Sequence, residues 1–146
     1  MPAYLDHAAT TPMRPEAVQA MLPYLTDHYG NPSGMHSLAR QARAAIDDAR
    51  EAIANALGAD SSEVVFTGGG TEADNTALMG SYAMGAGSIV CSAIEHHAVL
   101  RCIEALDGGI IPVLPSGVID LDAFEAMLDP TVSMVSVMLV LSLIHI

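Results

Sequence analysis

The sequence has no lysine, no tryptophan and only two cysteines among its 146 residues. Two cysteines are too few for a disulfide framework and favour a protein of the reducing cytoplasm. Positive charge is also scarce, because five arginines stand against seventeen Asp and Glu residues and the formal net charge is −12. A chain of this charge repels phosphate backbones and anionic lipid, so we expect neither nucleic acid nor a membrane surface as a partner.

The sequence also lacks targeting and membrane-spanning patterns. Residues 1–6 contain no basic region followed by an apolar stretch, so no signal peptide is expected. The most apolar segment, residues 132–146, is shorter than the ~20 residues that a spanning helix needs. Because 51% of the residues are hydrophobic and 15% are charged, we expect one globular domain, or part of one, rather than a disordered chain.

Beyond about residue 60, short runs rich in Val and Ile alternate with helical patterns and turn signals. The runs predict buried parallel strands at residues 63–67, 88–92, 110–114 and 132–140. Helices are predicted between the strands at residues 71–84, 97–106 and 122–128. The order βαβαβαβ predicts the α/β fold class, with a mainly parallel sheet and helices on its faces.

The first sixty residues follow a different pattern. We expect an extended piece, a short helix at residues 15–22, a loop at residues 29–35 and a long helix at residues 37–57. In the long helix, apolar residues recur every three or four positions, and Gly58 is a natural stop after its last turn. We therefore divide the chain into an N-terminal segment (1–60), part of a larger α/β domain (61–140) and a tail (141–146).

Three glycines, Gly68 to Gly70, join a predicted strand to a predicted helix that starts near Thr71. Glycines permit positive φ and close approach of a ligand, while free amides and the helix dipole favour a phosphate. No lysine follows, which excludes a Walker A loop. Gly68, Gly70 and Ala73 also match a dinucleotide-binding pattern, with Glu95 as a candidate ribose ligand. A glycine-rich turn without any ligand is the remaining interpretation.

Two adjacent histidines, His96 and His97, follow the next predicted strand. The carboxyl ends of parallel strands form the binding crevice, so either imidazole could meet a ligand held at Gly70 and Thr71. Neighbouring helical residues point about 100° apart, which makes the pair poorly suited to share one metal ion. The alternative is a histidine at a helix start that bonds only to backbone or water.

Four segments in this order resemble the NifS-like cysteine desulfurases of the class V aminotransferase group of pyridoxal-phosphate enzymes. They read YLDHAATTP at 4–12, GNPSG at 30–34 with HS at 36–37, FTGGGTEADN at 66–75 and EHHAVL at 95–100. Taken singly, the first two would pass for connecting loops. Together the matches cover residues 1 to about 140, which corresponds to the N-terminal third or so of a family member.

The resemblance implies fold type I, in which a large domain carries pyridoxal 5'-phosphate and a homodimer completes the active sites. Gly70 and Thr71 would hold the cofactor phosphate. His96 would stack on the pyridine ring and assist proton transfer, and the loop at 31–37 would lie near the active-site mouth and the dimer contact. The family removes sulfur from L-cysteine, giving alanine and an enzyme persulfide that a sulfur-acceptor or scaffold protein uses for iron–sulfur cluster or thio-cofactor assembly.

Several parts of the family's machinery have no counterpart in this sequence. There is no lysine to form the Schiff base, and neither Cys91 nor Cys102 matches the sulfur-accepting cysteine. Cys91 falls inside a predicted apolar strand and Cys102 inside a predicted helix, so both are interpreted as buried small hydrophobes. Residues 141–146 do not continue the family pattern and are interpreted as a non-native tail. We expect the chain by itself to be inactive. Another class V enzyme, such as a selenocysteine lyase or an aminotransferase, and a non-catalytic phosphate- or nucleotide-binding module remain alternatives.

Overall fold

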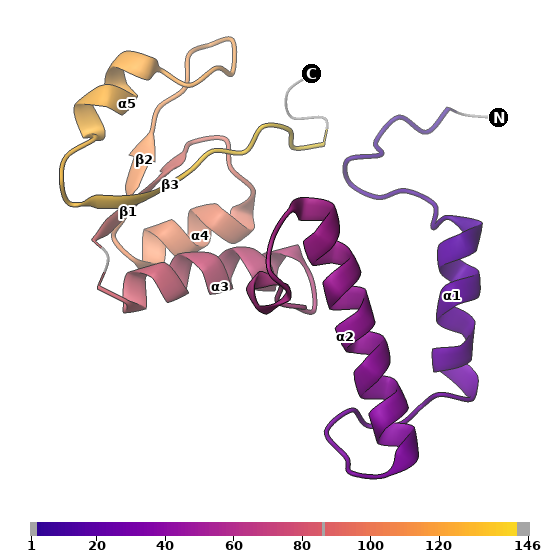
Figure 1. Cartoon of the computed structure of the whole chain (residues 1–146). Coiled ribbons are helices and arrows are strands. Elements are labelled where there is room, and N and C mark those ends of the chain that lie inside the picture. The colour runs from indigo at the N-terminus through magenta and orange to yellow at the C-terminus, as the bar shows by residue number, and fades with distance from the viewer. Residues whose placement is uncertain (1–2, 86, 143–146) are drawn as a thin grey trace. The chain divides into compact units, whose positions relative to one another are not determined.

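The computed structural model describes residues 3–85 and 87–142 (Figure 1). The chain divides into two compact units, one formed by Pro12–Phe66 and the other by the remaining described residues. The division at residues 60 and 140 expected from the sequence stays a prediction, and residues 143–146 of the predicted tail lie outside the described residues. Within the described ranges, no helix has both the length and the hydropathy that crossing a membrane requires.

The unit Pro12–Phe66 contains two α-helices and a short 3₁₀ helix. Helix α1 (Pro15–Thr26) starts with a proline, whose missing N–H has no partner to lose in the first turn. It runs beyond the predicted end at residue 22 and includes Pro23. None of its residues is buried, so α1 presents apolar side chains such as Met21 and Leu25 on its surface.

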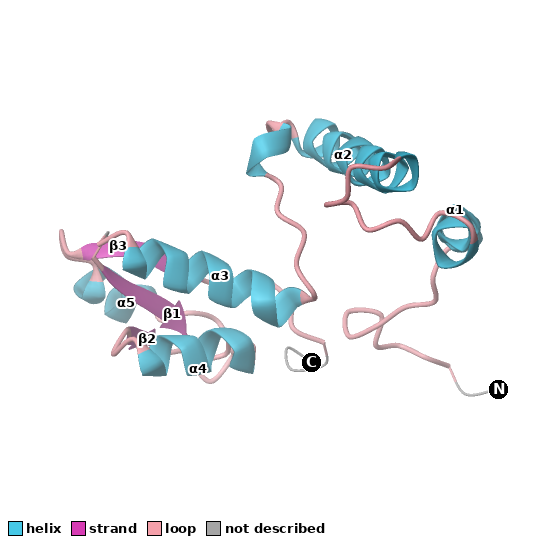
Figure 2. Ribbon diagram, turned by 90° about the horizontal axis from the view of Figure 1, so that it is seen from below, coloured by secondary structure: helices cyan, strands magenta, loops and turns pink. Residues whose placement is uncertain are grey.

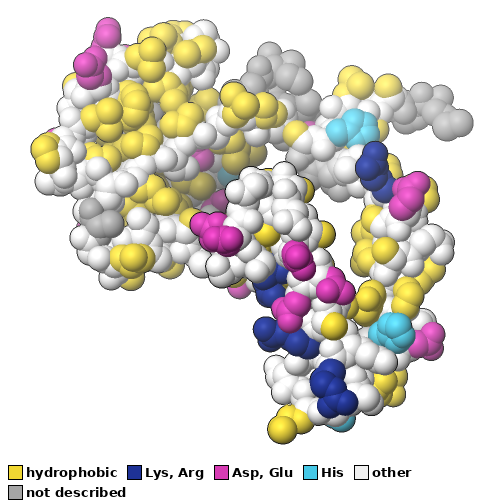
Figure 3. All heavy atoms as spheres, in the orientation of Figure 1, with side chains coloured by type: hydrophobic (Ala, Val, Ile, Leu, Met, Phe, Trp, Pro, Cys, Tyr) yellow, Lys and Arg dark blue, Asp and Glu magenta, His cyan; other side chains and the backbone are white. Residues whose placement is uncertain are grey.

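Helix α2 (Ser37–Leu57) has the bounds that the apolar periodicity predicts. The His36 side chain caps its start by accepting the Ala39 N–H, at 3.2 Å. Gly58 ends it with φ 69°, in the left-handed region that favours glycine. Charged side chains gather on α2 (Figure 3), where Asp47 accepts hydrogen bonds from both Arg43 and Arg50. Hydrogen bonding by Arg43, with a further contribution from Arg50, lowers the pKa of the exposed Asp47 carboxyl.

The strand predicted at residues 63–67 is wrong. The 3₁₀ helix η1 (Ser61–Glu63) occupies its beginning, and residues 64–67 have no regular secondary structure. Arg50 explains the difference, because its Nε donates to the Val64 carbonyl at 3.2 Å and its guanidinium lies 5.3 Å from the centre of the Phe66 ring. These contacts tie the β-branched segment to α2 instead of to a neighbouring strand.

The other unit has the predicted α/β architecture. A parallel sheet has the order β2-β1-β3, so the connection from β2 to β3 passes over the central strand. Its elements, in chain order, are α3 (Gly70–Ala83), β1 (Ser88–Ser92), α4 (His97–Ala105), β2 (Gly109–Ile111), α5 (Leu121–Met127) and β3 (Val132–Ser136). Each of these helices and strands overlaps a helix or strand that the sequence predicts, although β2 and β3 are shorter than their predicted ranges.

Helices cover both faces of this sheet. Helices α3 and α4 lie together on one side, and α5 lies on the other, next to β2 (Figures 1 and 2). The core between the sheet and the α3–α4 pair consists of Leu78, Ile89, Cys91, Val99, Cys102 and Ile103. The central strand β1 is therefore buried, as predicted, except at Ser88.

The sequence predicts that all the strands are buried, but in the structure β3 is only partly buried. In β3 the side chains alternate between half-buried and exposed, and Val135 is 38% exposed. Met134 points to the core that α3 and α4 cover, whereas Val135 pairs with Val90 on the side of α5. Because α5 packs on β2 at the far edge, it leaves the outer face of β3 uncovered.

Candidate functional site

The glycine loop leads directly into α3. Gly69 is the N-cap, and the first helical bond runs from the Ala73 N–H to the Gly69 carbonyl at 3.1 Å. The amides of Gly70 and Thr71 therefore have no partner within the helix, and they point out of its N-terminus together with the positive end of the dipole. This arrangement offers hydrogen-bond donors to an anion.

The three glycines of this loop leave space for a ligand. The positive φ angles that the sequence predicts for them are not found in the structure. The φ of Gly69 is 163°, which is extended backbone. Glycines with left-handed φ in the described residues lie elsewhere, for example at Gly58. A Cβ placed on Gly69 or Gly70 would meet no atom within 4 Å, so the backbone there is open to a ligand.

The N–H of Gly68, the first of the three glycines, already has a hydrogen-bond partner. Glu72 Oε2 accepts the Gly68 N–H at 2.7 Å, and Thr67 Oγ1 donates to the Gly69 carbonyl at 3.1 Å. These local bonds fix the turn before the helix. They leave Gly70 and Thr71, the pair predicted from the sequence, as the amides that face outward.

His96 stands at the start of α4. It is the N-cap residue, and its Nδ1 accepts the Ala98 N–H at 3.1 Å. A neutral ring with this bond carries its proton on Nε2, the nitrogen turned away from the helix. His97 is the first helical residue, with its ring centre 6.3 Å from that of His96. In the described part of the chain, no group of three or more His, Cys, Asp and Glu side chains is placed to hold a metal ion.

Thr71 and His96 line the same hollow, of about 490 Å³, between α3 and α4. Three further polar side chains from these helices, Asn75, His97 and Arg101, share it, and the apolar part comes from residues such as Met79. Asn75 lies one helical turn after Thr71, and Arg101 lies one turn after His97, so the helical period was the signal that could have found them. Gly70 does not line the hollow. It directly precedes Thr71, which does.

The reason that these residues meet differs in part from the prediction. Residues 3–69 form no strand, so Thr71 is not brought to the site by a strand end. It is brought there by the packing of α3 against α4. His96 does follow β1, as expected.

Glu95 does not fit the predicted role of ribose ligand. Only 5% of the residue is exposed, and its carboxylate accepts hydrogen bonds from the Ser136 hydroxyl at 3.3 Å and from the Met138 N–H. The dinucleotide-binding pattern also requires a strand before the glycines, which this structure does not have among residues 61–69.

The N-terminal motif folds into a turn within the same unit as the hollow. Tyr4 donates its hydroxyl to the carbonyls of Asp6 and Thr10, at 2.9 and 3.2 Å. His7 Nδ1 and Thr11 Oγ1 are 3.1 Å apart, and Asp6 accepts a hydrogen bond from Ser142. These contacts give the motif a local structural role.

The loop at residues 31–37 belongs to the unit Pro12–Phe66. Asn31 folds it back on itself, because its side chain accepts the Ser33 N–H and its carbonyl accepts the Gly34 N–H, both at 3.0 Å. The expectation that this loop lies at an active-site mouth and dimer contact stays a prediction.

Both cysteines are buried and unpaired. Burial, with smaller contributions from the negative charges of Glu95 and Glu104, raises the pKa of the Cys91 thiol to about 11. Burial also raises the pKa of the Cys102 thiol. At neutral pH both side chains are protonated, so neither is an activated nucleophile, in agreement with their interpretation as small core residues.

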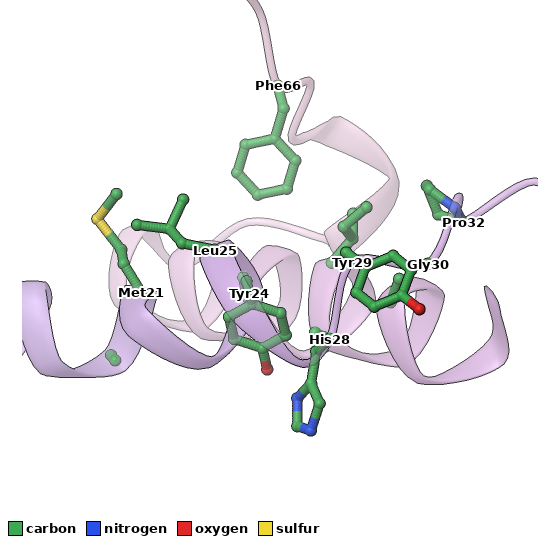
Figure 4. A pocket seen from close by; sticks show the side chains of 13 residues that line it. Met21, Tyr24, Leu25, His28, Tyr29, Gly30, Pro32 and Phe66 are labelled. Atoms are coloured by element: carbon green, nitrogen blue, oxygen red, sulfur yellow. The ribbon is translucent and has the colours of Figure 1, made fainter. Parts of the chain in front are cut away.

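A larger hollow, of about 710 Å³, lies within the unit Pro12–Phe66. Figure 4 shows Met21, Leu25 and Phe66 around it, and its polar groups are the side chains of Tyr24, His28 and Tyr29. Its described lining contains no Asp, Glu or Arg side chain. It therefore lacks an arginine that could hold a phosphate, whereas Arg101 lines the smaller hollow at Thr71, which is the candidate site.

Comparison with known proteins identifies the family. Residues 3–144 match the family described as aminotransferase class-V. The chain belongs to the class V aminotransferases. It is 43% identical over 143 residues to the cysteine desulfurase IscS of Dictyoglomus turgidum, covering 92% of this chain and 36% of that relative. The cysteine desulfurase of Cereibacter sphaeroides is 44% identical over 144 residues, covering 92% of this chain and 37% of the relative.

Solved structures give the same result. A NifS-like protein matches with a TM-score of 0.82 and 30% identity, over 94% of this chain and 40% of that one. A structure described as SspA in complex with cysteine matches with a TM-score of 0.78 and 34% identity, over 92% and 41%. The predicted resemblance and the predicted α/β fold class are confirmed, and the chain spans little more than a third of the length of these curated relatives.

Proposed function

We propose that this chain forms the phosphate end of a pyridoxal-phosphate site belonging to a cysteine desulfurase. Gly70 and Thr71 hold the phosphate, and His96 stacks on the pyridine ring. Membership of the class V aminotransferases implies this cofactor in general terms. The observation that carries the proposal is the hollow that Thr71 and His96 share, which runs along α3 and α4.

The residues present fit a phosphorylated aromatic cofactor. The outward amides of Gly70 and Thr71, the Thr71 hydroxyl and the helix dipole all favour a phosphate, and the Arg101 side chain adds positive charge to the same hollow. The open backbone at Gly69 and Gly70 leaves room for the phosphate oxygens. His96 is exposed, and its cap bond to Ala98 fixes the side of the ring that faces the helix.

When bound, pyridoxal phosphate supplies an electron sink for breaking bonds at the α-carbon of an amino acid. The contribution of this chain is to bind and orient that group. Thr71 donates its hydroxyl to the phosphate, and His96, with Nδ1 engaged, presents Nε2 as the nitrogen that can hold or release a proton.

L-Cysteine is the proposed substrate, with alanine and a persulfide as products and a sulfur-acceptor or scaffold protein as the recipient. The support comes from the relatives, which are cysteine desulfurases, and from the similar protein solved with cysteine. A homodimer and a location in the cytoplasm are part of the same proposal, the latter in keeping with two free thiols. Because the sequence has no lysine, we expect no turnover of cysteine by this chain alone.

The test is isothermal titration of the chain with pyridoxal phosphate, with pyridoxal and with NAD. We expect pyridoxal phosphate to bind most tightly and His96→Asn to weaken it, since Asn keeps a cap acceptor but removes the aromatic ring. The matched variant His28→Asn replaces an exposed histidine that does not line this hollow, and it should bind like the original chain. Tighter binding of NAD would instead support the nucleotide-binding module, and equal binding of pyridoxal would remove the role of the phosphate.

A further inference from the structure

The loop between β1 and α4 is fastened to both edge strands of the sheet. Toward β2, the Ala93 N–H donates to the Ile111 carbonyl at 2.9 Å. Within the loop, the Ile94 N–H donates to Ser92 Oγ at 3.2 Å. Toward β3, the Glu95 side chain accepts from the Ser136 hydroxyl and from the Met138 N–H. The loop that ends at His96 is thus held from two sides.

The Glu95 contact is unusual because it buries a charge. The residue is 5% exposed, and a buried carboxylate is unfavourable unless donors compensate for the water that it loses. Here Ser136 and Met138 supply donors from a segment more than forty residues further along the chain. Hydrogen bonds to a charged acceptor are stronger than neutral ones, so this contact restrains the loop more firmly than its neighbours do.

Glu95 is also the residue directly before His96. A rotation of the backbone at residue 95 would carry the imidazole with it and break the cap bond from the Ala98 N–H to His96 Nδ1. The carboxylate has no place in the hollow itself, whose described lining does not include Glu95. Its effect on any ligand there must pass through His96.

We propose that Glu95 is a positioning residue for His96, acting by anchoring the β1–α4 loop to the end of β3. The inference rests on the proposed function, because it assumes that the orientation of His96 matters for cofactor binding. The coupling from the Met138 amide through the Glu95 carboxylate to the His96 cap can be measured without any ligand.

The experiment compares Glu95→Ala and Glu95→Gln in the chain as it stands, with Glu125→Gln as the control. Glu125 is an exposed carboxylate on α5, and it does not line the hollow. Amide hydrogen exchange is followed at Met138 and Ala98, and the dissociation constant for pyridoxal phosphate is measured in parallel.

In Glu95→Ala we expect exchange at both amides to rise by about tenfold, as for the loss of one hydrogen bond, and the affinity to fall roughly tenfold. Glu95→Gln retains an acceptor and should keep the exchange rates and the affinity near those of the original chain. Glu125→Gln should change neither the exchange rates nor the affinity. If Glu95→Ala does not fold, Ser136→Ala removes one donor and should raise exchange at Ala98 in the same direction.

Faster exchange at Met138 with unchanged exchange at Ala98 would overturn the inference, because Glu95 would then hold only the strand. If Ala98 responds but no variant changes the affinity, the positioning role is equally wrong. Absence of binding by the original chain would count against the proposed function instead, and the exchange results would still decide whether Glu95 anchors His96.

Discussion

Thr71, in the first turn of α3, and His96, the N-cap of α4, line one hollow because the two helices pack against each other. Both helices therefore direct their N-terminal dipoles and free amides to the same region. A phosphate at Thr71 and an aromatic ring at His96 can belong to one ligand in this arrangement.

The Thr71 hydroxyl should contribute directly to phosphate binding. Thr71→Val removes the hydroxyl and keeps the side-chain shape, and a hydrogen bond to a charged group is worth about 1.5 kcal/mol, or roughly tenfold in affinity. Calorimetric titration with pyridoxal phosphate measures this loss. Thr76→Val is the matched control, since Thr76 is also on α3 but donates to the Glu72 carbonyl of its own helix. Equal losses in the two variants would contradict the role of Thr71.

Arg50 should stabilise the unit Pro12–Phe66 more than Arg43 does. Both pair with Asp47, but only Arg50 also bonds the Val64 carbonyl and covers the Phe66 ring. We expect Arg50→Ala to lower the free energy of unfolding by about 1–2 kcal/mol more than Arg43→Ala. Urea denaturation followed by circular dichroism gives both values. The same loss in the two variants would mean that the segment after η1 is not held by Arg50.

Two glycines should respond in opposite directions to alanine. Gly58→Ala places a Cβ at φ 69° and should cost about 1 kcal/mol. Gly80→Ala lies inside α3, where a Cβ meets no atom within 4 Å, and should gain about 0.5–1 kcal/mol from helix propensity. The midpoints of urea denaturation measure both changes. A stabilising Gly58→Ala would contradict the left-handed end of α2.

Alkaline pH should destabilise the fold through Cys91. The unfolded thiol ionises near its ordinary pKa of 9.0, whereas the folded thiol holds its proton to about 11. Between these values the native state binds more protons than the unfolded state, so the free energy of unfolding falls as pH rises, by up to about 1.4 kcal/mol per unit. Urea denaturation from pH 8 to about 11 should show a steeper decline for the original chain than for Cys91→Ala. Parallel curves would show that the thiol is not desolvated.

Helix α2 could be predicted to the residue because its signals are local. The apolar period sets its face and Gly58 sets its end, and neither depends on the rest of the chain. The strands β1, β2 and β3 were also located from their Val and Ile content, and their parallel pairing follows from the helices between them.

The segment Val64–Phe66 could not be predicted in this way. A run of β-branched residues has the same propensity whether or not a partner strand exists, and here Arg50 of α2 provides the competing contacts. Glu95 is a similar case. Its sequence position suggested a ligand contact, but its partners Ser136 and Met138 lie far along the chain, and no local pattern identifies them.

Pyridoxal phosphate is proposed to bind between Thr71 and His96. Titration of the ¹⁵N-labelled chain with pyridoxal phosphate, followed by two-dimensional NMR, tests it residue by residue. The largest shifts are expected at the amides of Gly70 and Thr71 and at the imidazole of His96. Shifts confined to the larger hollow around Tyr24 and His28, or no saturable shift at Thr71, would contradict binding between Thr71 and His96.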